Sequence, residues 1–501
     1  MRKQLETYKI NAEGIELPVV ITGGPGLIPE YELVLVTIGV ATNAMLDEVR
    51  NELIEQVTIS SKEILDPKII AKLKATFMEK ANVILMQKLP NLAEKVRKYL
   101  IAHLLHEMLG LGKLEFLLQD EHLEEIIINS ASEPVRVYHR KYGWLLTNII
   151  VDTEAKIQNY SNIIARRVGR QITTLTPLLD AHLVSGDRAN AVLYPVSNKG
   201  NTITIRKFAR DPWTVTDFIT SKTCSAEVFA LIWLAMQYEM NILVSGGTGS
   251  GKTSMLGVCL PFIPYNHRIL TVEDARELQL PEHLFWCPLT TRQPNPEGKG
   301  EVSMLDLLIN ALRMRPDRII LGEVRKARDA EVLFEAMHTG HSVYATLHAD
   351  SMTETISRIV NPPISVPANL LSAVHLNVVM FRDRRQGIRR VFQIGEFITT
   401  DDEGKVSAKP NLLYRWKASN DSIVAHGDRL HLYEQLSRHT GMSMQEITKD
   451  LAAKEKILNW MVKNNLRTIA DVGKIMKQYY LDSAMIVEAA TKNTPLKKVL
   501  G

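Results

Sequence analysis

The chain has 501 residues, of which 45% are hydrophobic and 23% are charged. This balance excludes an intrinsically disordered chain, and the length predicts two to four domains at about 150 residues each. The formal net charge is only +4, which argues against a dedicated nucleic-acid binder, because such proteins carry a marked positive charge.

The cysteines and the apolar runs bear on the cellular compartment. Cys224, Cys259 and Cys287 are far apart and form no CxxC pair, which argues against a zinc site and favours a reduced, cytoplasmic protein. Residues 1–8 lack the apolar core of a signal peptide. The longest apolar stretch, residues 33–41, is about half as long as a membrane-spanning helix. We therefore expect any membrane contact to be peripheral or made through a partner.

The N-terminal part is predicted to comprise an extension, residues 1–88, and an α+β domain, residues 89–212. The extension has a strand-like alternation over residues 32–40, helical segments after it, and no recognisable chemistry. In the domain, apolar residues recur at every fourth position from Leu92 to Met108, which predicts a helix ending near Gly110. Turn residues and apolar runs then predict strands and one further helix. These are strands over 125–129 and 135–139, a helix over 163–169, and a hairpin of 188–196 with 202–208.

Residues 209–222 contain Pro212, lose the periodicity and are predicted to be a linker. The C-terminal domain, residues 213–501, alternates apolar β-rich runs with helical ones, which is typical of an α/β fold with a parallel sheet covered on both faces. Ser443 and Glu446 have the spacing of a capping box, which predicts a helix start in the C-terminal tail. The apolar runs are residues 241–245, 268–272, 318–321 and 342–347.

The strongest motif follows the run at 241–245 and fits G-x-x-x-x-G-K-T in full, the Walker A phosphate loop. Glycines let backbone N–H groups turn inward around phosphates, and the next helix presents its positive end to the same anion. We expect Lys252 to reach the β- and γ-phosphates of ATP and Thr253 to ligate Mg²⁺. The nucleotide-binding residues are Gly246, Gly247, Thr248, Gly249, Ser250, Gly251, Lys252 and Thr253.

Two acidic residues follow apolar runs, one directly and one after a single glycine. Glu323 follows the run at 318–321 and Glu273, with Asp274 beside it, follows the run at 268–272. Carboxylates at the C-terminal ends of parallel strands lie at the mouth of the nucleotide crevice. There they can orient the attacking water or help hold Mg²⁺, so both are candidate catalytic residues and metal ligands. The alternative for each is a solvated residue at a strand end.

Two histidines flank the run at 342–347. His341 and His348 are seven positions apart and lie at opposite ends of this strand. No cysteine or third ligand is near, which disfavours a metal site, whereas a hydrogen-bonding sensor of the γ-phosphate suits an imidazole. A structural role is the remaining alternative.

Arginines concentrate in the domain before the linker. Most exposed arginines form a solvated face, but in a ring-shaped ATPase some can reach the γ-phosphate of a neighbouring subunit. Arg188 and Arg206 lie on the predicted hairpin and are the candidate catalytic arginines. The full group is Arg166, Arg167, Arg170, Arg188 and Arg206.

Together these stretches resemble the type II and type IV secretion ATPase superfamily. Residues 312–317 with 322–325 look like its Walker B block, and residues 339–341 with 346–348 look like its His box. Residues 112–118, 187–196 and 204–208 are similar to its N-terminal domain, so the resemblance runs from about residue 90 to 400. The long N-terminal extension, the helical tail and the lack of a four-cysteine insert resemble the archaeal secretion, pilus and archaellum-motor branch.

The resemblance implies a RecA-like P-loop ATPase domain that binds ATP and Mg²⁺ and assembles into a homo-hexamer. It also implies docking on a polytopic membrane platform protein and action on pilin-like or archaellin subunits at the inner face of the membrane. The alternative is a RecA-like nucleic-acid translocase, which predicts aromatic residues among the basic ones. Aromatics are only 6% of the chain and none lies among Arg166 to Arg170, so we expect no nucleic acid. A nucleotide switch without hydrolysis is disfavoured by Glu323 and the two histidines.

Overall fold

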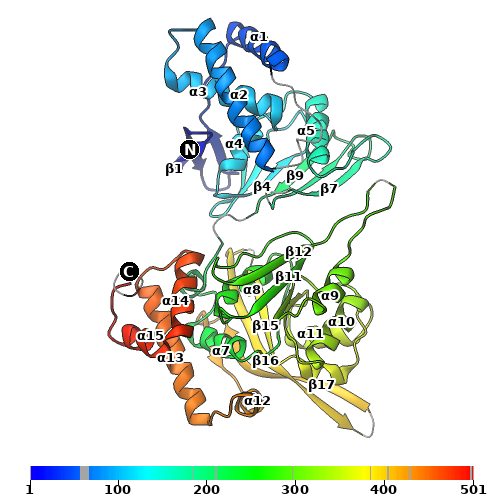
Figure 1. Cartoon of the computed structure of the whole chain (residues 1–501), viewed down its shortest axis with the longest axis vertical. Helices are drawn as coiled ribbons and strands as arrows, with labels where there is room; N and C mark the ends of the chain where they lie inside the picture. Colours follow the sequence, from blue (N-terminus) through cyan, green and yellow to red (C-terminus); the bar gives the residue numbers. More distant parts are fainter. Residues whose placement is uncertain are drawn as a thin grey trace. The chain divides into compact units, whose positions relative to one another are not determined.

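The structure of the protein is a computed structural model. It describes residues 2–56, 67–183, 186–208, 212–295, 297–383, 385–402, 405–427, 430–496 and 499. The chain forms two compact units, drawn in Figure 1: unit 1 is Met1–Arg210 with Asn295–Lys299, and unit 2 is Asp211–Pro294 with Gly300–Gly501. Within the described residues, no helix has both the length and the apolar character needed to cross a membrane.

Unit 1 is built on a nine-stranded sheet in the order β1-β2-β3-β6-β5-β4-β9-β8-β7. All neighbouring strands are antiparallel except β3 and β6, which are parallel. The strands are β1 (Lys3–Ala12), β2 (Ile15–Gly23), β3 (Glu30–Leu33), β4 (Leu123–Ile128), β5 (Arg136–His139), β6 (Gly143–Thr147), β7 (Leu178–His182), β8 (Arg188–Val192) and β9 (Thr202–Arg206). The helices are α1 (Val40–Gln56), α2 (Pro67–Lys88), α3 (Glu94–Leu109), α4 (Leu114–Gln119) and α5 (Glu154–Arg167).

Residues 1–88 contribute three strands to this sheet and share one hydrophobic core with the residues that follow. The first two strands form a hairpin because Glu13 and Gly14 both have positive φ, of 50° and 77°. Such a two-residue turn matches the twist of paired strands. Every second residue of β2 from Ile15 is buried, so the hairpin lays one apolar face on the core.

Unit 2 contains a second nine-stranded sheet in the order β12-β11-β13-β14-β10-β15-β16-β17-β18. The first six strands in this order are parallel, and β16, β17 and β18 are antiparallel additions. The strands are β10 (Ile242–Gly246), β11 (Arg268–Glu273), β12 (Phe285–Thr290), β13 (Arg318–Leu321), β14 (Ser342–Leu347), β15 (Leu376–Asp383), β16 (Ile388–Asp402), β17 (Lys405–Lys417) and β18 (Ser422–Ala425).

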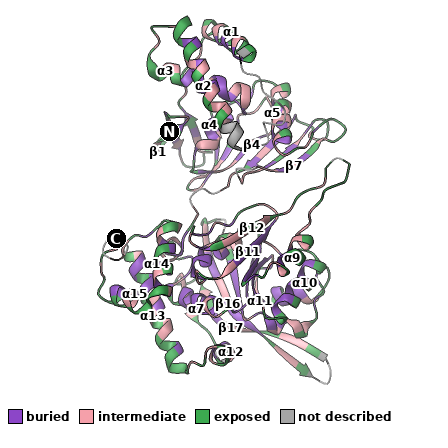
Figure 2. Cartoon of the chain, in the orientation of Figure 1, coloured by how far each residue is buried: buried purple, intermediate pink, exposed green. Residues whose placement is uncertain are grey.

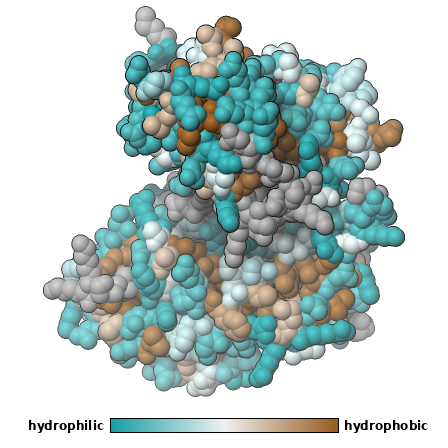
Figure 3. All heavy atoms as spheres, turned by 45° about the horizontal axis from the view of Figure 1, so that its top comes forward, coloured by the Kyte–Doolittle hydropathy of each residue, from teal (hydrophilic) through white to brown (hydrophobic). Residues whose placement is uncertain are grey.

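Helices cover both faces of this sheet, as the buried residues of Figure 2 show. Alternate residues of β10 face opposite sides: Ile242 and Val244 belong to one hydrophobic core and Leu243 to the other. The first core holds α7 (Ala226–Gln237), α8 (Lys252–Cys259), α12 (Leu430–Thr440), α13 (Met444–Lys463), α14 (Ile469–Leu481) and α15 (Ser483–Thr491). The second holds α9 (Met304–Leu312), α10 (Ala327–His338) and α11 (Met352–Val360). On the visible surface in Figure 3, hydrophilic and hydrophobic side chains are intermixed.

The predicted parallel strands β10, β11, β13 and β14, the hairpin of β8 with β9 and the capping box at Ser443 are confirmed. Two predictions are wrong in part. The predicted linker contains a short helix, α6 (Val215–Thr220), because Thr214 and Asp217 form a capping box; residues 209–211 of this linker lie outside the described residues. The strand predicted over residues 32–40 ends at Leu33, and α1 begins at Val40.

Candidate active site

The phosphate loop joins β10 to α8 and turns at glycines. Gly249 and Gly251 have φ of 70° and 95°, a backbone region that disfavours side chains, so the tight turn into α8 depends on them. The Lys252 ammonium and the Ser250 hydroxyl both donate to the Gly247 carbonyl, at 3.1 and 2.8 Å. Both bonds lie within the loop, so the side chains that are expected to contact phosphate also hold the loop in a closed turn. Thr248 is exposed at its tip, and Thr253 is half-buried in the first turn of α8.

Strand register brings the predicted acids to the edge of the sheet where this loop lies. Val272 pairs with Leu321, Leu321 pairs with Ala345, and Ala345 pairs with Leu243. The residues that follow these parallel strands therefore emerge at one edge. Glu273 and Glu323 both lie there, and so does Gly246.

The electrostatics of Lys252 reflect this arrangement. Burial lowers the pKa of its ammonium, and the nearby carboxylates of Glu323 and Asp350 oppose that shift. Asp350 also lies against the loop, since a Cβ added to Gly247 would be 2.5 Å from its Oδ1. These two carboxylates thus favour the charged form of the lysine that is expected to contact the nucleotide.

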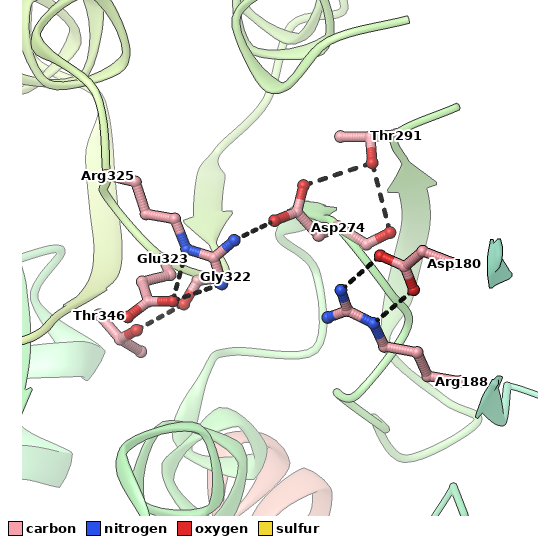
Figure 4. A network of polar contacts seen from close by, with 8 residues as sticks. All are labelled: Asp180, Arg188, Asp274, Thr291, Gly322, Glu323, Arg325 and Thr346. Atoms are coloured by element: carbon pink, nitrogen blue, oxygen red, sulfur yellow. Dashed lines mark hydrogen bonds and ion pairs between the residues drawn. The ribbon is translucent and has the colours of Figure 1, made fainter. Parts of the chain in front are cut away.

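Glu323 takes part in a network of polar contacts shown in Figure 4. Its carboxylate pairs with Arg325 at 2.7 Å, and the same guanidinium pairs with Asp274 at 2.8 Å. Behind Glu323, the Thr346 hydroxyl donates to the Gly322 carbonyl at 2.6 Å. Arg325 thus links the acids that follow β13 and β11, and its side chain is 58% exposed, which leaves it room to turn toward solvent.

Glu273 is buried and only half satisfied by hydrogen bonds. Its Oε1 accepts from the backbone N–H groups of Glu277 and Leu278, at 2.9 and 3.0 Å. Its Oε2 is buried and has no hydrogen-bond partner among the described residues. Burial raises the pKa of this carboxyl to about 7. An orphaned carboxylate oxygen at this edge fits a cation or its bound water, because Mg²⁺ in nucleotide sites needs only one or two carboxylates beside the phosphates.

The two histidines do not come together. His348 follows the C-terminal end of β14, at the edge of the phosphate loop, whereas His341 precedes the N-terminal end of that strand. The Nδ1 atom of His341 instead lies 3.2 Å from the Thr339 hydroxyl. Within one chain, the position of His348 suits a phosphate sensor and that of His341 does not.

The candidate arginines of unit 1 lie on neighbouring strands. Arg188 of β8 pairs in register with Arg206 of β9. The Arg188 guanidinium makes a two-pronged ion pair with Asp180, at 3.0 and 2.7 Å (Figure 4). Of the nearby basic group, Arg167 pairs with Glu115 and Arg170 donates to the Asp180 carbonyl. The role of Arg188 and Arg206 as arginine fingers stays a prediction.

Four residues of the site were not assigned a role from the sequence. Arg325 and Asp350 lie just beyond Glu323 and His348, so their closeness to known motifs was an available signal. Arg382 and Arg389 belong to the hairpin of β15 with β16, and Arg389 Nε donates to the Gly249 carbonyl at 3.0 Å. The phosphate loop and this hairpin are 140 residues apart in sequence, and no local pattern connects them.

A complete phosphate loop between a parallel strand and a helix, with carboxylates at the same edge of the sheet, defines a P-loop ATPase with a RecA-like domain. The chain belongs to the family described as Type II/IV secretion system protein, whose profile matches residues 115–413. This membership and the complete loop make it a secretion-type ATP hydrolase.

Two relatives in sequence and one solved structure are similar to the chain. An uncharacterized protein of Methanocaldococcus jannaschii is 35% identical over 384 residues, covering 75% of this chain and 68% of the relative. The type IV secretion system protein PtlH of Bordetella pertussis is 30% identical over 306 residues, covering 54% of this chain and 89% of PtlH. The solved structure of the Legionella pneumophila ATPase DotB shares 18% identity at a TM-score of 0.40, covering 75% of this chain and 93% of DotB.

Proposed function

We propose that this ATPase is a hexameric motor that powers secretion or the assembly of a type IV pilus or archaellum filament. The observation that carries the proposal is the convergence of Lys252, Glu323 and Glu273 at one edge of a RecA-like sheet, in a chain of the type II/IV secretion family. The name of PtlH, a type IV secretion system protein, agrees with a machine of this kind. The similarity to a protein of an archaeon favours the archaeal branch.

We assign the residues the following roles. Backbone N–H groups from Gly246 to Gly251 and the Lys252 ammonium bind the phosphates of ATP. Glu323 accepts a proton from, and orients, the attacking water. His348 senses the γ-phosphate by a hydrogen bond from the end of β14.

Thr253, Glu273 and Glu323 would hold Mg²⁺ directly or through its water ligands. When bound, the ion supplies positive charge that offsets the charge developing on the phosphate oxygens. The half-satisfied Glu273 carboxyl is the protein group whose environment fits this role best. No group of three or more His, Cys, Asp or Glu residues that could hold a metal by itself occurs in the described ranges, which agrees with an ion held jointly with the nucleotide.

The proposed assembly is a homo-hexamer at the inner face of the cell membrane. We infer that it docks on a polytopic platform protein and acts on pilin-like or archaellin subunits, as the family resemblance implies. Light scattering tests the assembly: the protein should form hexamers with a nonhydrolysable ATP analogue and Mg²⁺. Monomers under every nucleotide condition would contradict it.

The second candidate function, a RecA-like nucleic-acid translocase, shares the sheet and the loop. Steady-state ATPase assays with and without single-stranded DNA separate the two. A motor of the secretion type should hydrolyse ATP at the same rate in both, whereas strong stimulation by DNA would favour the translocase.

A further inference from the structure

The hairpin of β15 and β16 carries two arginines directly opposite each other beside the phosphate loop. Arg382 and Arg389 are register partners in this antiparallel pair. Side chains at such positions lie on the same face, about 5 Å apart at Cβ, and like charges there destabilise the pair. Both side chains therefore lie on one face of the hairpin.

This face of the hairpin lies against the loop. Arg389 Nε donates to the Gly249 carbonyl at 3.0 Å, and its Cδ lies 3.5 Å from where a Cβ of Gly251 would be. Arg382 Nη1 is 2.6 Å from the corresponding position on Gly249. Met380, two residues before Arg382 and hence on the same face, comes within 3.8 Å of the Cβ position of Gly251.

The bond to Gly249 also orients the loop. In a trans peptide the carbonyl and the following N–H point in opposite directions. Holding the Gly249 carbonyl toward Arg389 therefore holds the Ser250 N–H toward the loop interior, where it donates to the Gly247 carbonyl. Such inward N–H groups are the anion ligands of a phosphate loop.

The charged residues that follow the two arginines in sequence are turned to other partners. Asp383, the next residue along β15, projects to the opposite face, and its Oδ1 accepts from the backbone N–H groups of Arg385 and Gln386. Arg390, the next residue along β16, pairs with Asp421 at 2.7 Å. The positive charge of this hairpin thus lies beside the loop, where Arg389 contacts it, and an anion bound in the loop suits this charge.

We propose that Arg382 and Arg389 form a clamp on the outer arm of the phosphate loop, which holds the loop in the shape that binds the polyphosphate of the nucleotide. The clamp rests on the proposed binding of ATP at this loop. Since it faces the loop and not the attacking water, it contributes to binding of ATP and ADP alike. Its members are binding and positioning residues, and turnover at saturating ATP does not depend on them.

The test compares Arg382→Ala, Arg389→Ala and Arg389→Lys with Arg385→Ala, a matched control that removes an exposed arginine from the same hairpin. Titration calorimetry with ATP and with ADP measures affinity, and steady-state assays measure kcat and KM. Loss of a charge-assisted contact should weaken both nucleotides about tenfold and raise KM, with kcat and the control unchanged. Arg389→Lys, which keeps the charge but not the Nε–H bond, should recover part of the affinity.

Thermal unfolding separates the clamp from a structural role. Without nucleotide, Arg382→Ala and Arg389→Ala should unfold close to the wild-type temperature, because the loop keeps its internal hydrogen bonds to the Gly247 carbonyl; with ADP they should gain less stability than the wild type. Wild-type affinity in both variants, or equal losses in Arg385→Ala, would overturn the clamp. If the wild type bound neither nucleotide, the clamp would fall together with the proposed function, whereas failure of the clamp variants alone would leave that function standing.

Discussion

The phosphate loop follows β10, which divides the unit 2 sheet into a parallel half, β12, β11, β13 and β14, and a mixed half, in which β15 is parallel and β16 to β18 are antiparallel. In the parallel half, Glu273 ends β11, and Glu323 and His348 follow β13 and β14. In the mixed half, β15 and β16 bring Arg382 and Arg389 against Gly249. We propose that the acids and the sensor of the γ-phosphate govern turnover and that the two arginines govern affinity. On this proposal, the two halves of one sheet serve the same loop with separable effects.

Lys252→Ala should have the largest effect, because Lys252 lies on the loop that both halves share. We expect hydrolysis to fall by about 10²-fold or more and nucleotide binding to weaken, since a direct charge-assisted phosphate contact is lost. An ATPase assay and titration with ATP measure the two effects, with circular dichroism as the check on folding. Near-normal turnover in the folded variant would refute the assignment of the loop.

Glu323→Gln should isolate the parallel half. Hydrolysis should fall by about 10²- to 10⁴-fold because the group that activates water is lost, while ATP binding persists and the trapped ATP state favours the assembled ring. Filter binding and single-turnover hydrolysis measure this, with Glu331→Gln as the matched control, because Glu331 is an exposed acid on α10 that pairs with Arg328. A variant that folds but fails to bind ATP would make Glu323 a structural residue instead.

Arg188→Ala and Arg206→Ala test whether unit 1 contributes to turnover in addition to the two halves of the unit 2 sheet. We expect a loss of at least about tenfold with thermal stability nearly unchanged, and wild-type activity that rises more than linearly with protein concentration. Asp180→Ala is the control, because it breaks the ion pair of Arg188 but keeps the arginine. If both arginine variants hydrolyse ATP like the wild type, unit 1 has no arginine finger.

The smallest effect that we predict is on stability, in Glu273→Gln without nucleotide or Mg²⁺. Burial raises the pKa of this carboxyl from 4.5 to about 7, so its neutral form stabilises the fold fully below pH 4.5, and this contribution disappears as the pH rises through 7. The amide does not titrate. Urea unfolding without nucleotide or Mg²⁺ should therefore favour the variant over the wild type by more at pH 8 than at pH 5. An equal difference at both pH values would contradict the raised pKa.

The sequence predicted β10, β11, β13 and β14 because their signals are local, whereas it did not predict β12 or β15. Each predicted strand is a short apolar run, followed at once or after one glycine by an acid, a histidine or the first glycine of the loop. The rule that places acids at the C-terminal edge also separates His348 from His341, which lies at the other end of β14. Chain direction along this strand is therefore enough to distinguish the two histidines.

The arginines beside the phosphate loop and the N-terminal strands of unit 1 depend on contacts between distant segments, which the sequence did not reveal. The contact of Arg389 with Gly249 arises only when β15 pairs with β10 and β16 folds back along β15. The β1–β2 hairpin left a local signal, since Ile15, Leu17, Val19 and Ile21 alternate with other residues after Glu13-Gly14. The pairing of β3 with β6 joins this hairpin to the rest of the sheet. It connects distant segments, and no periodicity in the sequence predicts it.

The most direct test of the division between the two sheet halves measures kcat and KM for ATP in Glu323→Gln and Arg389→Ala side by side. We predict opposite outcomes: Glu323→Gln loses kcat and retains ATP binding, and Arg389→Ala retains kcat and raises KM about tenfold. Similar losses of kcat in both variants, or an unchanged kcat in Glu323→Gln, would contradict this division.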